Sequence, residues 1–294
     1  MKMFFQQIIN GITLGSTYAL TAIGYTMVFG ILELVNFSHG AVYMFGAFIC
    51  LMLMTALGIG FLPAFVISVL LTGIFGILID KVALLPLRKK NAPKVTALIS
   101  TIGISIFLQN LVMVVWGSET KNFPLAFNLG FIQFESFRIS YLQIIILLTS
   151  VILMMGLTLL VKKTKIGKAM RATAQNMEAA RLMGINVDHI VSFTFFLGAG
   201  LATVAGVMVG MYYQSVDPMM GFMAGLKAFA AAVLGGIGIL PGAILGGLLI
   251  GVTETLAAGY IHSGYRDAIA FAILITVLLI KPTGLLGKEV QKKV

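Results

Sequence analysis

Residues 161–190 read VKKTKIGKAMRATAQNMEAARLMGINVDHI and form the longest polar interruption in an otherwise mostly apolar chain. This interruption holds six Lys and Arg residues and lies between two long apolar runs. Its local signals are nevertheless helical, because Asn176 is a good N-cap and Glu178 lies in the first turn behind it. Gly184 suits the position after a helix end. The stretch therefore predicts a short helix over 177–183, and a second one is expected upstream at about 168–175.

Neither helix is long enough to be stable alone, because isolated helices in water need about 12–15 residues. Both would need a partner surface, from this chain or from another protein. The stretch predicts a cytosolic segment that another protein grips. The alternative is a connecting loop whose basic residues only set the membrane topology.

Composition places the chain among polytopic membrane proteins. Of its 294 residues, 59% are hydrophobic and 10% are charged, and its mean hydropathy is +1.04. Apolar runs reach about 20 residues, the length of a helix that crosses a bilayer, whereas a membrane β-barrel would show shorter alternating segments. The sequence therefore predicts an all-α protein of eight or nine transmembrane helices, in a single transmembrane domain covering residues 1–294.

The distribution of charge indicates topology and not nucleic-acid binding. Fifteen of the 20 Lys and Arg residues fall within 81–94, 162–181 and 281–293. Basic residues in short connecting segments mark the cytoplasmic side. We expect segments 81–94, 162–190 and 281–294 in the cytosol, and the loops 117–140, 214–220 and 261–265 outside. The single Cys50 allows no disulfide within the chain.

The expected spans follow from the apolar runs. They are 11–32, 41–57, 62–79, 95–116, 141–161, 191–213, 221–240, 241–260 and 267–280. Pro86 and Pro93 are expected to break helices between the third and fourth spans. The side of the N-terminus stays open: nine full spans place it outside, whereas eight spans, or one re-entrant segment, place it inside.

Two stretches are expected to be irregular at membrane depth, Glu33–Gly40 and Gly235–Gly242. Broken backbone inside a bilayer is tolerated only where protein or a water-filled cavity covers it, and transporters place such breaks near their path. The glycine stretch favours the alternative of close helix packing, since Gly recurs at four-residue spacing at positions 238, 242 and 246 and again at 247 and 251. The first stretch carries polar side chains, so Asn36, Ser38 and His39 are candidates for lining a translocation path.

Ionisable residues in or near the spans are few: Glu33, His39, Lys227 and Glu254. Such residues cost about 2.5 kcal/mol or more near the bilayer centre and are often functional. Lys227 and Glu254 therefore join the path candidates, although Lys227 has the alternative of snorkelling to the surface. Arg266 and Asp267 are expected to form a local pair at the interface.

Signatures of an enzyme are missing from the sequence. It holds no Cys/His cluster for a metal and no nucleophile elbow. Gly284–Glu289 contains a Gly-Lys pair without the spacing or the Ser/Thr of a phosphate-binding loop. We therefore expect no cofactor, no metal and no ATP site in this chain, so that any ATP-driven motor is a separate polypeptide.

Several motifs resemble a known family. Glu178-Ala-Ala-x-x-x-Gly184 resembles the EAA loop of bacterial ABC importer permeases. Four further pieces, in chain order, resemble the LivH-type permease of the high-affinity branched-chain amino acid importers. These are Asn36-Phe-Ser-His-Gly40, Arg171-Ala-x-Ala-x-Asn176, Ala180-Arg-Leu-Met-Gly-Ile-Asn186, and Lys227-Ala-Phe followed by Val233-Leu-Gly-Gly-Ile-Gly238.

The resemblance implies a heteromeric importer in the bacterial inner membrane, with a cytosolic C-terminus on this subunit. Its partners would be a second, different permease, two ATP-binding subunits, an external substrate-binding protein and membrane lipid, without nucleic acid. The cargo would be leucine, isoleucine and valine, although relatives on the same plan carry urea or short amides. The implied coupling residues are Arg171, Asn176, Glu178, Ala179, Ala180, Arg181 and Gly184.

Two other interpretations compete with this one. The first is a secondary carrier driven by an ion gradient, with Glu254 or His39 as the coupling group. The second is a membrane scaffold without a path, which would not need the polar groups of Asn36–Gly40.

Overall fold

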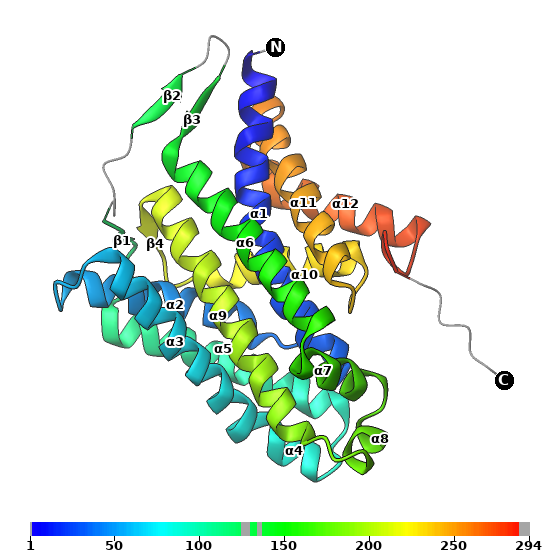
Figure 1. Ribbon diagram of the computed structural model, residues 1–294. Helices are drawn as coiled ribbons and strands as arrows, with labels where there is room; N and C mark the ends of the chain where they lie inside the picture. Colours follow the sequence, from blue (N-terminus) through cyan, green and yellow to red (C-terminus); the bar gives the residue numbers. More distant parts are fainter. Residues whose placement is uncertain (1, 125–129, 134–136, 288–294) are drawn as a thin grey trace.

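The computed structural model describes residues 2–124, 130–133 and 137–287. Part of the expected outer loop 117–140 and residues 288–294 of the expected cytosolic tail therefore lie outside the described residues. The described chain is almost entirely helical (Figure 1). Its membrane helices are α1 (Lys2–Leu32), α2 (Ser38–Thr55), α3 (Phe61–Ile79), α5 (Lys94–Trp116), α6 (Tyr141–Lys163), α9 (Val187–Tyr213), α10 (Met220–Gly235), α11 (Leu240–Tyr260) and α12 (Arg266–Ile280). The all-α membrane fold is confirmed.

Eight helical stretches are long and apolar enough to cross a membrane, and α10 is a shorter apolar helix of 16 residues. Shorter elements connect them: the π-helix η1 (Asp80–Leu84), α4 (Leu85–Lys89), α7 (Lys165–Gln175), α8 (Met177–Leu182) and the 3₁₀ helix η2 (Ser263–Tyr265). The expected count of eight or nine spans thus corresponds to eight full helices and one short one among the described residues.

The centre of the molecule is the contact between α1 and α11. Most of α1 is buried from Gly11 onward, and glycines let the two backbones touch. A Cβ atom at Gly251 would collide with the backbone of Gly15, and one at Gly247 would collide with Ala19. Small residues at four-residue spacing permit this approach because membrane helices associate by close packing. The interpretation of Gly247 and Gly251 as packing residues is confirmed, whereas no atom of the described residues lies within 4 Å of a Cβ placed on Gly238.

Helix α9 forms the second half of the core and packs against α1, α2 and α3. Its contact with α2 also depends on glycine, since Gly46 faces Thr203 and Gly206 faces the carbonyl of Tyr43. Helices α5, α6 and α12 lie at the periphery, and most of their apolar side chains are partly or fully exposed. In a membrane those faces meet lipid or partner subunits.

The two ends of the molecule differ in character (Figure 1). At one end, the first turns of α1 lie beside the hairpin of β2 (Phe131–Gln133) and β3 (Arg138–Ser140), where the Gln6 side chain accepts from the Arg138 amide at 2.9 Å. Strand β1 (Lys121–Asn122) pairs with β4 (Ser215–Val216), which joins two loops expected on the outer side. Helices α4, α7 and α8 lie at the opposite end.

Several helix boundaries differ from the sequence prediction, and three of the differences concern α1, α4 and α10. Helix α1 begins at Lys2, nine residues before the expected start of the first span. Pro86 does not break the chain, because it lies in the first turn of α4, where a missing N–H has no helical partner to lose. Helix α10 ends at Gly235, five residues before the expected end, because Gly236 and Gly238 have φ of +103° and +90°.

The polar stretch Glu33–Gly40 is only partly irregular. Glu33 has a φ of +50°, and helix α2 already begins at Ser38. The non-helical backbone is thus confined to residues 33–37. Within this segment Glu33 is exposed, Asn36 is buried and the other three residues are partly buried. This agrees with the rule that irregular backbone at membrane depth is covered by protein or lines a cavity.

Candidate functional site

The predicted cytosolic helices form α7 and α8. The Asn176 side chain accepts from the Ala179 amide at 2.9 Å and caps α8, as its residue type predicts. Gly184 has a φ of +83°, and its amide donates to Arg181 while the Ile185 amide donates to Ala180, both at 3.0 Å. These two bonds form a Schellman motif, so both ends of α8 are fixed by their own sequence. Helix α7 begins three residues earlier than expected, because Thr164 caps it.

The exposed face of α8 is partly apolar. Leu182 and Met183 are 89% and 83% exposed, although both are large hydrophobic residues. Glu178, Ala179 and Arg181 are exposed beside them, whereas Ala180 points inward and is buried within the chain. Leu182 and Met183 were not among the predicted coupling residues. Two adjacent large apolar residues in a polar segment are the signal that would have indicated them.

Arg171, the other predicted coupling residue, lies on α7. Its guanidinium donates to the carbonyl of Val161 near the end of α6. This contact ties α7 to α6, and the buried Gly167 lies close to the same carbonyl. The seven predicted coupling residues are therefore all brought to one end of the molecule, on α7, α8 and the turns that flank α8.

The polar side chains after α1 face the interior of the protein. The Asn36 side chain accepts from the Ser38 hydroxyl at 2.6 Å and from its amide at 3.1 Å. A ring nitrogen of His39 lies 3.2 Å from the carbonyl of Thr21, and the ring packs edge-on against Tyr25 at 4.6 Å. Asn36, Ser38 and His39 are all buried. The bonds between Asn36 and Ser38 fix the turn before α2, and His39 ties the first turn of α2 to α1.

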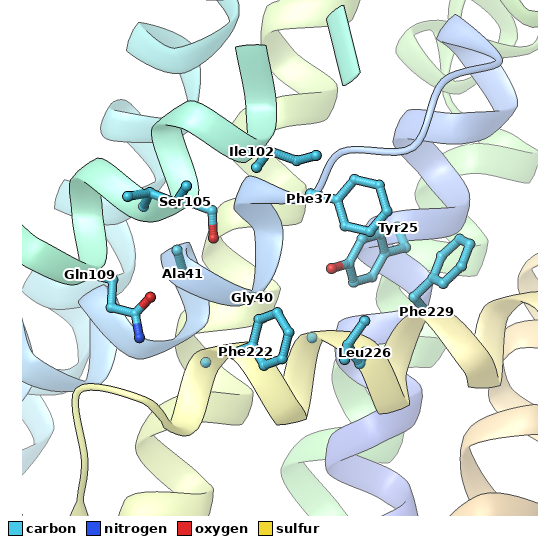
Figure 2. Close-up of a pocket in the computed structure, with 13 residues that line it drawn as sticks. Tyr25, Phe37, Gly40, Ala41, Ile102, Ser105, Gln109, Phe222, Leu226 and Phe229 are labelled. Carbon is cyan, nitrogen blue, oxygen red and sulfur yellow. The ribbon is translucent and has the colours of Figure 1, made fainter. Parts of the chain in front are cut away.

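The neighbours of these residues line a cavity of 420 Å³ between α2, α5 and α10 (Figure 2). Its wall is mostly apolar and aromatic, with Tyr25, Phe37, Ile102, Phe222, Leu226 and Phe229, and Ser105 and Gln109 add polar groups. Helices α2 and α10 cross beside it where Gly40 meets Gly221 and Gly225. The volume falls in the range of small-molecule sites.

Sequence reasoning missed this cavity. The prediction named Asn36, Ser38 and His39, whereas Phe37 and Gly40 of the same stretch line the space. The glycines at 221 and 225, alternating with Phe222 and Phe229 on one helix, are the signal that could have indicated an aromatic wall beside a close helix crossing.

Lys227 and Glu254 are brought together in a different place. The Lys227 ammonium lies 2.9 Å from a carboxylate oxygen of Glu254 and 2.6 Å from one of Asp267. The Tyr18 hydroxyl donates to the second Glu254 oxygen at 3.0 Å. The expected local pair of Arg266 with Asp267 is wrong, because Asp267 turns to Lys227 instead. A carboxylate in the first turn of a helix can pair with a residue of a neighbouring helix instead of with the residue beside it in sequence.

This cluster borders a cavity of 450 Å³ that also contacts Tyr213, Asp217 and Arg266 near the end with the outer loops. The five predicted path residues thus divide into two groups, with Asn36, Ser38 and His39 in one and Lys227 and Glu254 in the other. Within the described residues, no three His, Cys, Asp or Glu side chains gather as a metal site would require.

Comparison with known proteins gives the family. A family model described as the permease component of a branched-chain amino acid transport system matches residues 7–278. The chain belongs to this family. The resemblance drawn from the sequence motifs is confirmed.

This permease is 48% identical to the high-affinity branched-chain amino acid transport system permease protein BraD of Pseudomonas aeruginosa, with 98% of each chain covered. It is 46% identical to LivH of Escherichia coli K12, over 98% of this chain and 97% of that one. A probable branched-chain amino acid transport permease protein LivH of Methanocaldococcus jannaschii is 31% identical, over 93% and 89% of the two chains.

Membership makes the protein a multi-pass membrane permease and not an enzyme. A permease of this transport class acts with ATPase and binding-protein partners. The α7–α8 segment lies at one end of the molecule (Figure 1) and exposes Leu182 and Met183 there.

Proposed function

We propose that this permease forms half of the translocation path of an ATP-driven importer for branched-chain amino acids in a bacterial inner membrane. A second, different permease would complete the path, two separate subunits would bind and hydrolyse ATP, and an external binding protein would deliver the cargo. Helices α7 and α8 and the C-terminus would face the cytosol. The N-terminal end of α1 would then lie outside, beside the hairpin of β2 and β3.

The observation that carries the proposal is that α8 exposes apolar side chains at the surface of a chain that belongs to this family. This helix is capped at both ends by its own residues and packs against its own chain through the buried Ala180. It nevertheless exposes Leu182 and Met183 side by side. Exposed apolar residues rimmed by polar ones are typical of a docking surface. A cleft on an ATPase subunit is the occupant that the transport class supplies.

Movement of α8 would reach the path through α9. Only residues 183–186 separate α8 from α9, so the two helices cannot move independently over a long distance. Helix α9 packs closely on α2 at Gly46 and Gly206. The first turn of α2 borders the 420 Å³ cavity. Closure of the two ATPases on ATP would thus displace α8, then α9, and then the wall of the cavity.

The cavity of Figure 2 suits the proposed cargo. Its aromatic and aliphatic lining would accept a leucine, isoleucine or valine side chain more readily than urea or a short amide, because it offers few polar groups to replace water. Asn36, Ser38 and His39 would act on this space through the start of α2, which they hold in place. Lys227 and Glu254 would act at the outer cavity.

The first experiment is purification of the tagged permease in mild detergent, followed by mass spectrometry of the co-eluting proteins. We expect two ATPase subunits and a second permease, and reconstitution with the binding protein should give leucine uptake that requires ATP. Competition by valine, by urea and by acetamide then identifies the cargo class.

The opposite outcome is equally clear. A permease that purifies alone would leave α8 without its partner. Uptake that survives ATP depletion and collapses with an uncoupler would indicate an ion-driven carrier, and Glu254 would then be the first residue to test.

A further inference from the structure

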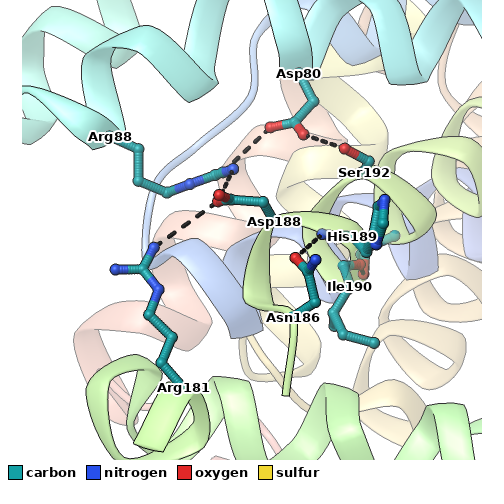
Figure 3. A network of polar contacts seen from close by, with 9 residues as sticks. Asp80, Arg88, Arg181, Asn186, Asp188, His189, Ile190 and Ser192 are labelled. Carbon is teal, nitrogen blue, oxygen red and sulfur yellow. Dashed lines mark hydrogen bonds and ion pairs between the residues drawn. The ribbon is translucent and has the colours of Figure 1, made fainter. Parts of the chain in front are cut away.

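One nearly buried guanidinium lies where three elements of the cytosolic end meet (Figure 3). Arg88, on α4, donates to a carboxylate oxygen of Asp80 at 3.2 Å and, through its other terminal nitrogen, to one of Asp188 at 3.0 Å. Asp80 is fully buried directly after α3, and Asp188 lies in the first turn of α9. The Arg88 side chain therefore joins the rod formed by α3, η1 and α4 to the start of α9.

A second bond strengthens this junction. The hydroxyl of Ser192, one turn beyond Asp188 on α9, donates to the other oxygen of Asp80 at 2.7 Å. Helix α9 is thus held to the rod both directly and through Arg88. Asp80 also begins the π-helix η1, and π-helical turns inside longer helices are frequent at functional sites.

Helix α8 reaches the same cluster through one looser contact. A terminal nitrogen of Arg181 lies 3.8 Å from the Asp188 oxygen that Arg88 also contacts, and the Arg181 side chain is 53% exposed. Arg88 further lines a cavity of 320 Å³ together with Met177, the first residue of α8. The junction is therefore hydrogen-bonded closely to α3 and α9 and contacts α8 only through the longer Arg181–Asp188 pair. A cavity borders the first residue of α8 at the same place.

We propose that Arg88 is a positioning residue that passes the displacement of α8 on to α3 and α9 together. The inference rests on the proposed function, because it assumes that an ATPase moves α8. A guanidinium suits this role because its planar fork holds two carboxylates in fixed directions, whereas an ammonium is a point charge on a flexible stem. When α8 moves, Asp188 is drawn between Arg181 and Arg88, and the rod follows α9.

The test uses the complete complex, reconstituted in vesicles with its ATPases and the external binding protein. Leucine uptake and ATP hydrolysis are measured in the same vesicles for wild type, Arg88→Lys and Asp188→Asn. The matched control is Lys89→Gln, which removes a neighbouring exposed charge on α4.

We expect both variants to assemble and to hydrolyse ATP near the wild-type rate, while leucine taken up per ATP falls about tenfold, a typical size for a lost coupling. Lys89→Gln should keep the wild-type ratio. A side chain that only stabilised the fold would lower the abundance of the complex and leave that ratio unchanged in the complexes that form.

Three results would overturn the inference. The first is a wild-type ratio in whichever of the two variants assembles. The second is failure of both variants to assemble, which would show that the junction holds the fold and does not transmit movement. The third is a wild-type complex without ATP-driven uptake, which would defeat the proposed function itself, whereas the first two leave that function standing.

Discussion

Two clusters of buried charge lie toward opposite ends of the permease, and they differ in how they reach the surface. The outer cluster consists of Lys227, Glu254, Asp267 and Tyr18, all on the membrane helices α1, α10, α11 and α12. The inner cluster consists of Asp80, Arg88, Asp188 and Ser192, and Arg181 extends it to the surface helix α8.

The difference shows that buried ion pairs can have different roles in the two clusters. Burying a charge is costly unless a partner compensates it, and removing one partner costs more than the pair itself contributes. In the outer cluster, Lys227 lies between two carboxylates and so holds three membrane helices in register. The inner cluster holds membrane helices too, but its last member, Arg181, is half exposed on α8, the helix proposed above to dock an ATPase. We therefore expect the outer cluster to govern stability and the inner cluster to govern coupling.

Replacing Lys227 with Met should have the largest effect. Glu254 is 2% exposed and would keep only the Tyr18 hydroxyl as a partner, so we expect a loss of roughly 3–5 kcal/mol of stability. The amount of permease in purified membranes and its thermal aggregation in detergent measure this loss.

The double variant Lys227→Met with Glu254→Gln is the control. It removes both buried charges, and Asp267 is exposed enough to be solvated, so much of the stability should return. If the single variant were as stable as wild type, the outer cluster would not be the stabilising one, and the comparison would fail.

Changes at α8 should affect transport more than stability. Gly184→Val places a β-branched residue at a φ of +83°, and Ala180→Trp places a large side chain where alanine is buried. We expect both variants to be inserted at normal abundance and to lose leucine uptake.

Gly184→Asn is the matched control for the first of these variants. Asparagine tolerates a positive φ far better than valine does, so uptake should largely persist. Normal uptake by Gly184→Val or by Ala180→Trp at normal abundance would remove α8 from the coupling mechanism and with it the role given to the inner cluster.

Tyr18→Phe should have a moderate effect on the outer cluster. It removes the hydroxyl that donates to Glu254 but leaves Lys227 in place, so about 1 kcal/mol of stability should be lost. Thermal unfolding in detergent measures the loss, while uptake per ATP should stay unchanged. A fall in that ratio without a loss of stability would give the outer cluster a coupling role.

Glu33→Gln should have the smallest effect. Its pair with Lys94 has a short distance of 2.6 Å, but the two side chains are 69% and 65% exposed. Exposed pairs contribute about 0–1 kcal/mol, because water and salt screen them. Stability and uptake should both stay near wild type, and a large loss of either would show that pairing alone, without burial, carries weight here.

Much of the structure of α7 and α8 could be predicted from sequence, because its determinants are local. The cap at Asn176 and the turn at Gly184 depend on residues within one helical turn, and the structure contains both. The glycines at 247 and 251 likewise predict a close helix contact, although they do not predict which helix makes it.

The direction in which individual side chains point could not be predicted from the sequence. In a soluble protein the alternation of polar and apolar residues indicates the buried face of a helix, but lipid-facing residues are as apolar as the core. Asn36, Ser38 and His39 therefore attracted attention by polarity, although Phe37 and Gly40 line the cavity. The ion pairs could not be predicted either, because their members are distant in sequence; Arg88 and Asp188 lie 100 positions apart.

By itself, the sequence determined that this chain is a bundle of membrane helices with a capped short helix in its longest polar segment, because span length and helix ends are properties of neighbouring residues. Only the tertiary structure decided that Lys227 bridges Glu254 and Asp267, and that Arg88 joins α3 to α9 beside α8. Those contacts depend on which helices cross and at what depth. That choice is made by backbone packing between segments distant in the chain, and no single segment encodes it.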